Sequence, residues 1–148
     1  MSEKSYKFYG WEGAPKKVLY LYDLLSEIWS VETCAPRLRQ KWSRENKTCG
    51  QCSITAFLVQ DVLGGDVYGI PLPDGGFHCY NVVGENLFDL TSEQFDPKFR
   101  DDLGDDPTEL CYEGNPLQSR DVHFAKEEKR LRYELLKGRL LEVLPKDF

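Results

Sequence analysis

The chain has 148 residues, of which 41% are hydrophobic and 30% are charged, and its formal net charge is -6. This length is typical of one domain around one core, so we expect a single domain over residues 1–148. The aromatic content of 13% is unlike that of an intrinsically disordered chain, so we expect a folded protein. The negative charge argues against a nucleic-acid partner, because phosphate binding depends on clustered Lys and Arg.

The N-terminal residues are polar, and no apolar run reaches the length of a signal peptide or a membrane span. We therefore expect a cytoplasmic location and no membrane partner. The five cysteines, Cys34, Cys49, Cys52, Cys79 and Cys111, cannot all pair within one molecule. Reduced thiols are the expected state, because a chain of this length does not depend on disulfides. No cofactor is indicated.

Helices and loops are predicted for the first part of the chain. Residues 1–15 mix aromatic residues and glycines without a period, which indicates an irregular segment. Apolar residues recur at helical spacing over 16–30, which predicts a helix with one buried face. Residues 34–48 read as a loop with a short helical turn. A second apolar run, 53–63, starts at Gly50-Gln51-Cys52 and ends at Gly64-Gly65, which predicts a helix beginning near Cys52.

Three short strands are predicted next, at 66–72, 77–83 and 87–90, and they form an antiparallel meander. Thr91 and Gln94 have the spacing of a capping box, so a short helix carrying Phe95 should follow. Residues 96–115 read as an acidic loop, followed by a helix over 121–137 and an edge strand over 139–144. The expected fold class is α+β, with the cysteine-bearing helix packed on a small antiparallel sheet.

Cys52, His78 and Asp89 form the candidate catalytic site. A thiol is a useful nucleophile only as a thiolate, which the positive end of a helix and a nearby imidazole both favour. His78 begins the second predicted strand and can serve as the base, while Asp89 on the next strand can orient the imidazole.

The register between the last two strands decides whether this site forms. A two-residue loop at Gly84-Glu85 places Tyr80 opposite Asp89, with His78 diagonal to it on the same face and Cα atoms about 7–8 Å apart. A half-register shift moves Asp89 to the opposite face, because side chains alternate along a strand. The sequence leaves both registers open.

The Gly50-Gln51-Cys52 motif and the order Cys, His, Asp resemble those of transglutaminases and related papain-like thiol enzymes. A closer resemblance is to the small bacterial YunG-like family, and it rests on Trp42, Gly50 to Ala56, Gly64-Gly65-Asp66, His78 with Asn81, and Asp89 to Phe95. The resemblance implies a papain-like or transglutaminase-like cysteine proteinase fold. The chain departs from transglutaminases in its shorter length and in Ser53, where they commonly place Trp.

The reaction implied is acyl transfer from an amide, ester or thioester of a small molecule or peptide, by hydrolysis or to an acceptor. The main-chain N–H of Cys52 is the first candidate donor to the oxyanion, and the side chains of Gln51, Trp42 and Asn46 are further candidates. The sequence does not indicate an oligomeric state.

Other functions fit some of the same residues. The same fold can be an inert binding module, since aromatic residues crowd the segment before Pro15. Cys49 and Cys52 have the spacing of a redox pair, although no strand precedes them. A structural zinc site would use Cys49, Cys52, His78 and Cys79, but adjacent strand residues point to opposite faces. His123, the second histidine, is expected to be a solvated residue near a helix terminus.

Overall fold

The structure, a computed structural model, describes residues 6–73, 75–99 and 110–148. Its helices are α1 (Lys16–Ile28), α2 (Cys52–Leu63), α3 (Arg120–Phe124) and α4 (Glu127–Val143), and its strands are β1 (Asp66–Pro71), β2 (Phe77–Val83) and β3 (Asn86–Phe88). Short 3₁₀ helices occupy Trp11–Gly13, Pro36–Lys41, Ser92–Phe95 and Pro97–Phe99. The predicted α+β class and antiparallel meander are confirmed, with strand order β1-β2-β3. The predicted acidic loop lies largely outside the described residues.

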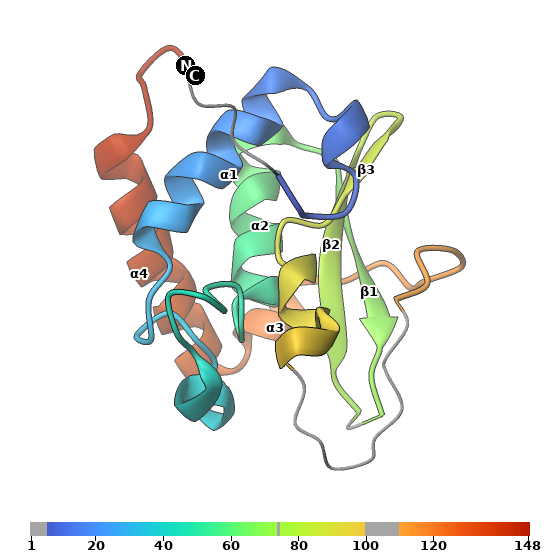
Figure 1. Cartoon of the computed structure of the whole chain (residues 1–148), viewed down its shortest axis with the longest axis vertical. Helices are drawn as coiled ribbons and strands as arrows, with labels where there is room; N and C mark the ends of the chain where they lie inside the picture. The colour runs from blue at the N-terminus through green and yellow to red at the C-terminus, as the bar shows by residue number, and fades with distance from the viewer. Residues whose placement is uncertain (1–5, 74, 100–109) are drawn as a thin grey trace.

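Helix α2 lies between the sheet on one side and helices α1 and α4 on the other (Figure 1). Every residue from Ser53 to Val59 is buried, as expected for a helix that is apolar on all sides. Gly64 follows its last residue with a φ of 80°, in the left-handed region where glycine is favoured. Because α2 is enclosed, its first residue, Cys52, has a fixed position relative to β2.

The hairpin between β2 and β3 adopts the register that the candidate site requires. Val83 pairs with Asn86 and Val82 with Leu87, so the loop consists of Gly84 and Glu85. Gly84 has a φ of 60°, as two-residue hairpin loops demand. The chain beyond β3 therefore brings Asp89 to the same face of the sheet as His78.

The irregular N-terminal segment packs into the fold and does not merely lead into it. Phe8 is fully buried and its ring lies 4.7 Å from that of Tyr22 on α1. Next to it, Tyr9 forms an isolated β-bridge with Asp89, whose N–H donates to the Tyr9 carbonyl at 2.9 Å. The N-terminal segment thus fixes the main chain at Asp89.

Two predictions for the C-terminal part are wrong. The edge strand over 139–144 is helical, because α4 continues to Val143 with Leu136 and Leu140 buried one turn apart against the core. Arg139 also donates to the Ile28 carbonyl at 3.1 Å, which holds this turn of α4 against the end of α1. The single helix over 121–137 is two helices, since Lys126 is extended between α3 and α4.

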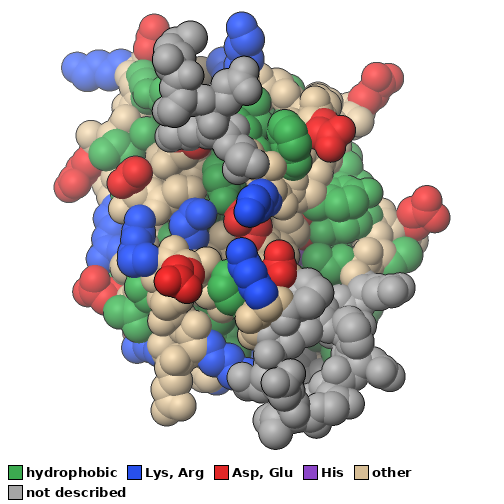
Figure 2. Space-filling model, viewed as in Figure 1, with side chains coloured by type: hydrophobic (Ala, Val, Ile, Leu, Met, Phe, Trp, Pro, Cys, Tyr) green, Lys and Arg blue, Asp and Glu red, His purple; other side chains and the backbone are tan. Residues whose placement is uncertain are grey.

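The surface carries both signs of charge. On the face drawn in Figure 2, Lys and Arg side chains are interspersed with Asp and Glu. That face therefore lacks, in its described part, the continuous basic strip that binds a phosphate backbone. Within the described ranges, no helix combines the length and apolar character needed to cross a bilayer.

Candidate active site

Cys52 is the first residue of α2, and the approach to it requires a glycine. Gly50 has a φ of 71°, and a Cβ atom there would lie 2.5 Å from the Cys34 sulfur and 2.8 Å from the Ala35 nitrogen. The Cys52 side chain is partly exposed. The Cys52 N–H, at the positive end of the helix, forms no hydrogen bond within the part of the chain described.

His78 and Asp89 form a buried pair. His78 Nε2 lies 2.5 Å from Asp89 Oδ2, and the two side chains are 0% and 1% exposed. The edge of the His78 ring also contacts Phe95, with ring centroids 4.7 Å apart. Because Asp89 engages Nε2, the ring nitrogen left for the Cys52 thiol is Nδ1, which makes no hydrogen bond of standard geometry among the described residues. In this structure the Cys52 thiol donates to the Phe77 carbonyl at 3.8 Å.

The carboxylate of Asp89 is held by three further hydrogen bonds. Tyr112 donates its hydroxyl to Oδ2 at 2.8 Å, while the Thr91 N–H and hydroxyl approach Oδ1 at 3.2 and 3.4 Å. Donors to both oxygens fix the orientation of this carboxylate toward His78. Tyr112 was not identified from the sequence, because it lies in a segment read as a loop and no pattern connects it to Asp89.

The charges of the site favour an ion pair between Cys52 and His78. Burial by itself lowers the pKa of His78, but the charge and hydrogen bond of Asp89, with a smaller effect of Cys52, raise it to about 10. Burial opposes the Cys52 thiolate, yet the hydrogen bond and charge of His78 and the Cys79 N–H lower the pKa of the thiol. The arrangement therefore stabilises a thiolate beside an imidazolium, the form in which a cysteine attacks a carbonyl.

Two of the three side chains expected to donate to an oxyanion, Gln51 and Trp42, donate to main-chain carbonyls instead. Gln51 is fully buried and its Nε2 donates to the Ser30 carbonyl at 3.0 Å. Trp42 Nε1 donates to the Lys47 carbonyl at 3.0 Å. Asn46 is buried, with Oδ1 lacking a hydrogen-bond partner among the described residues. Since the Gln51 and Trp42 donors are engaged in this way, the Cys52 N–H remains the best placed donor.

Gln94 connects the start of α2 to the turn after Asp89. Its Nε2 donates to the Thr91 carbonyl at 2.9 Å, and its Oε1 accepts the Gly50 N–H at 3.2 Å. The capping box predicted for Thr91 and Gln94 is not formed, since the Thr91 side chain accepts no capping bond and the segment is a 3₁₀ helix. The glutamine instead holds the loop before Cys52 against the loop that carries Asp89.

The other predicted roles of Cys49 receive no support. Cys49 is buried and its thiol donates to the Leu38 carbonyl at 3.9 Å. The acidity of its thiol is coupled to Cys34, whereas that of Cys52 is coupled to His78. In the described part of the chain, no group of three or more His, Cys, Asp and Glu side chains is arranged to hold a metal ion. The zinc site considered for Cys49, Cys52, His78 and Cys79 is therefore not assembled.

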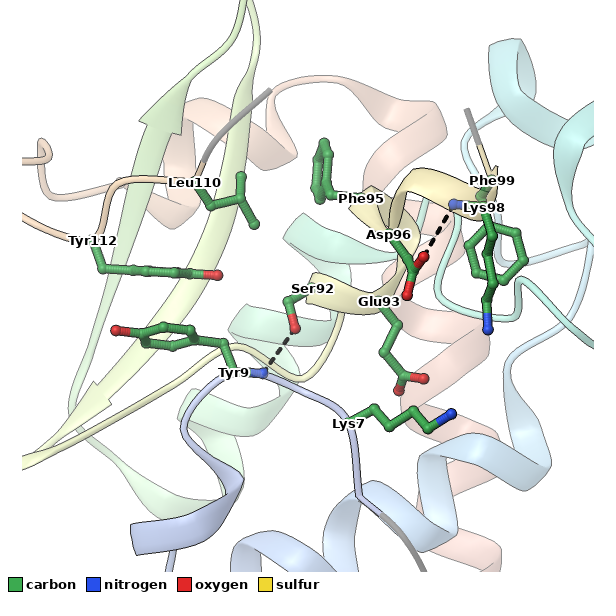
Figure 3. A pocket seen from close by; sticks show the side chains of 10 residues that line it. All are labelled: Lys7, Tyr9, Ser92, Glu93, Phe95, Asp96, Lys98, Phe99, Leu110 and Tyr112. Carbon is green, nitrogen blue, oxygen red and sulfur yellow. Dashed lines mark hydrogen bonds between the residues drawn. The ribbon is translucent and has the colours of Figure 1, made fainter. Parts of the chain in front are cut away.

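A pocket of about 360 Å³ lies on the Asp89 side of the site (Figure 3). Tyr9, Phe95, Phe99 and Tyr112 contribute aromatic walls, and the charged residues around it are Lys7, Glu93, Asp96 and Lys98. Tyr9 and Tyr112 stack with ring centroids 3.9 Å apart. The pocket shares Tyr112 and Phe95 with the site, since the first bonds Asp89 and the second contacts His78.

His123 is not the solvated residue expected from the sequence. It is only 9% exposed. Its Nδ1 accepts a hydrogen bond from the Lys129 ammonium at 3.0 Å, and its Nε2 lies 2.8 Å from Gln118 Oε1. An ammonium only donates, so the ring is neutral with its proton on Nε2. It lies against Phe57 of α2, with centroids 5.2 Å apart, and has a structural role.

Acid should destabilise the fold through His123. Burial, together with the charges of Lys129 and Lys126, lowers the pKa of His123 to about 4. Between pH 4 and about 6.5 the unfolded chain binds the proton and the folded chain does not, so stability falls as pH decreases through this window. His123→Gln should flatten that part of the pH dependence, measured by urea unfolding from pH 4 to 7. An unchanged slope in the variant would contradict the assignment.

Comparisons with known proteins place the chain in a family. The YunG protein family matches residues 17–145. The uncharacterized protein YunG of Bacillus subtilis (strain 168) is 36% identical over 72 residues, which cover 49% of this chain and 57% of that protein. The chain thus spans a little over half the length of this curated relative. No solved structure matches the chain. Since the family match extends over most of its length, the chain belongs to the YunG family.

Proposed function

We propose that this member of the YunG family is a cysteine-dependent acyl-transfer enzyme, a thiol hydrolase or acyltransferase with Cys52 as its nucleophile. The observation that carries the proposal is the buried pair in which His78 Nε2 lies 2.5 Å from Asp89 Oδ2, next to a thiol at a helix start. The carboxylate is buried and hydrogen-bonded at both oxygens, unlike that of an ordinary surface ion pair. It therefore holds the imidazole in one orientation.

The reaction follows from the roles of these atoms. The Cys52 thiolate attacks the carbonyl carbon of an amide, ester or thioester, and the oxyanion is stabilised by the Cys52 N–H. The His78 imidazolium gives the proton on Nδ1 to the leaving group, while Asp89 stabilises its positive charge. Water or an amine then attacks the thioester on Cys52, with His78 accepting its proton. The class of fold we propose is papain-like or transglutaminase-like.

The pocket in Figure 3 is the proposed place for part of the substrate. Cys52, His78 and Asp89 do not line it themselves, but two of its walls touch the site, since Phe95 contacts His78 and Tyr112 bonds Asp89. We propose that the remote part of a substrate binds there while its carbonyl reaches Cys52. The pocket's mixture of aromatic rings and both signs of charge fits a small molecule or peptide with polar and apolar parts.

A second candidate function is an inert binding module on the same fold. The observation that favours it is the exposure of Tyr9 and Trp11, at 50% and 37%, with Tyr9 in the pocket wall. Exposed aromatic rings beside a pocket are typical of a recognition surface. The two functions differ in whether a covalent intermediate forms on Cys52.

An acyl-trapping experiment tests the proposal. The chain is incubated with activated esters, thioesters and peptide amides, and intact-protein mass spectrometry measures a mass increase equal to the acyl group. We expect the adduct on Cys52, its loss in Cys52→Ser, and its retention in Cys111→Ser, which changes an exposed thiol. Binding of these compounds without any adduct on Cys52 would support the binding module instead.

A further inference from the structure

Cys34 and Cys49 are brought together by two loops at the base of α2. Cys34 follows α1, and Cys49 precedes the glycine that leads into α2. The Ala35 N–H donates to the Gly50 carbonyl at 3.0 Å, so the two loops are directly hydrogen-bonded. The Cys34 sulfur lies against the Gly50 backbone, where a Cβ atom would approach it to 2.5 Å. The residues next to both cysteines are therefore in contact.

Each thiol donates to a main-chain carbonyl, Cys34 to Ala35 at 3.4 Å and Cys49 to Leu38 at 3.9 Å, and the acidities of the two thiols are also coupled to each other. The hydrogen bond from Cys34 lowers the pKa of Cys49, with Lys41 and Arg37 adding to the effect, while burial opposes it. The same hydrogen bond, with burial, raises the pKa of Cys34. Cys49 is thus the more acidic thiol of the two, an asymmetry typical of reactive thiol pairs.

Basic side chains surround the pair. Arg132 donates to the Thr33 carbonyl at 3.1 Å and to the Gly50 carbonyl at 3.5 Å, while Arg39 donates to the Cys34 carbonyl at 3.3 Å. The hydrogen bond with Cys49 and burial raise the pKa of Cys34, and the charges of Arg132 and Arg39 oppose this rise. Cys79, by contrast, is buried in β2 and burial raises the pKa of its thiol well above the usual range, so it is an unreactive thiol of the same chain.

Exposure decides which sulfur meets an oxidant first. Cys49 is 5% exposed, whereas Cys34 is 0% exposed. Both residues are buried, but the more acidic thiol belongs to the residue that retains some exposure. This is the arrangement of an attacking cysteine with a resolving cysteine.

We propose that Cys34 and Cys49 form a reversible intramolecular disulfide when the chain meets a peroxide. The Cys49 thiolate attacks one peroxide oxygen, the O–O bond breaks, and the departing hydroxide takes a proton and leaves as water. The Cys34 sulfur then attacks the Cys49 sulfenic acid, the S–O bond breaks, and a second water leaves with the Cys34 proton. The two thiols lose two electrons and two protons, and the peroxide is reduced to two waters.

The proposal is independent of the proposed acyl-transfer function, and so is its test. Cys52→Ser removes the candidate nucleophile and leaves four of the five cysteines. After hydrogen peroxide treatment and denaturation, we expect the free-thiol count of this variant to fall from four to two. Trypsin should yield a cross-linked pair of peptides containing Cys34 and Cys49, which separates after reduction with dithiothreitol.

Matched double variants identify the two roles. In Cys52→Ser with Cys34→Ser, the sulfenic acid on Cys49 has no resolving partner and should be trapped by dimedone. In Cys52→Ser with Cys79→Ser, the Cys34–Cys49 disulfide should still form. The proposal is overturned if four thiols persist in Cys52→Ser, if the cross-link involves Cys79 or Cys111, or if the wild-type chain pairs Cys49 with Cys52. The acylation of Cys52 is measured separately on the fully reduced chain, so its outcome does not depend on these results.

Discussion

Alkylation of Cys52 by iodoacetamide at pH 6 should slow at least about tenfold when His78 is replaced by Ala. An unperturbed thiol with a pKa near 8.5 is only about 0.3% thiolate at this pH. His78 lowers the pKa of Cys52 through its hydrogen bond and charge, so the wild-type site holds more thiolate. Part of the advantage is lost because a thiolate of lower pKa is a weaker nucleophile. The measurement is the alkylation rate of each cysteine between pH 5 and 9, resolved by peptide mass spectrometry.

The shape of the pH profile separates this effect from a loss of structure. The wild-type rate at Cys52 should begin to fall at a lower pH than the rate in the variant. His78→Gln serves as the matched control, because the amide fills most of the site without carrying a charge. Cys111, which is exposed, reports the alkylation rate of a thiol outside the site in every sample. Identical profiles for Cys52 in the wild type and both variants would show that His78 does not ionise the thiol.

Asp89→Asn should remove a large part of the pH dependence of stability above neutrality. Burial opposes the charge of His78, but Asp89, with a smaller effect of Cys52, raises the pKa of the imidazole to about 10, against about 6.5 in the unfolded chain. Cys52→Ser removes the smaller effect and leaves that of Asp89. The folded chain therefore keeps a proton that the unfolded chain releases, and this stabilisation is complete below pH 6.5 and lost as pH rises toward 10. Breaking a buried ion pair of this kind destabilises by about 3–5 kcal/mol. Acyl-transfer activity should fall by several orders of magnitude, because the neutral amide no longer stabilises the imidazolium.

This prediction is measured by urea unfolding from pH 6 to 10, with Cys52→Ser in both proteins to remove the titration of the thiol. The free energy of unfolding should decrease with pH in the protein that keeps Asp89 and change much less in the Asp89→Asn variant. Tyr112→Phe is the matched control, since it removes one hydrogen bond to Asp89 and keeps the carboxylate. It should cost about 1 kcal/mol and preserve the slope. If the free energy of unfolding changed equally with pH in the Asp89→Asn variant and in the protein that keeps Asp89, the ion pair between His78 and Asp89 would be refuted.

Helix α2 and the β2–β3 hairpin were predictable because their signals are local. The apolar run after Cys52 and the glycines at its end predict a buried helix, and this prediction does not require knowing which elements pack on it. The hairpin itself was predictable, but its register was not, because the sequence allows both loop lengths. The structure has the two-residue loop Gly84-Glu85, and this choice places Asp89 on the same face of the sheet as His78.

Features that depend on distant segments were not predictable in this way. The C-terminal segment was assigned to a strand, but packing of Leu136 and Leu140 on the core keeps it helical. His123 looked solvated because its partners, Phe57 among them, come from elsewhere in the chain. The sequence suggests Gln51 and Trp42 as donors to an oxyanion, but in the structure their side-chain N–H groups donate to main-chain carbonyls.

The sequence by itself determined the α+β class, the helix that begins at Cys52, and the set of Cys52, His78 and Asp89 as candidates. Hydrophobic periodicity and turn residues act over a few neighbouring residues, so they can be recognised in the sequence without knowledge of the tertiary contacts. Only the tertiary structure decided that Tyr112 and Tyr9 hold Asp89, and that Cys49 faces Cys34 and not Cys52. These contacts join segments that are far apart along the chain. They have no signature in the local sequence, because they depend on how whole elements pack against one another.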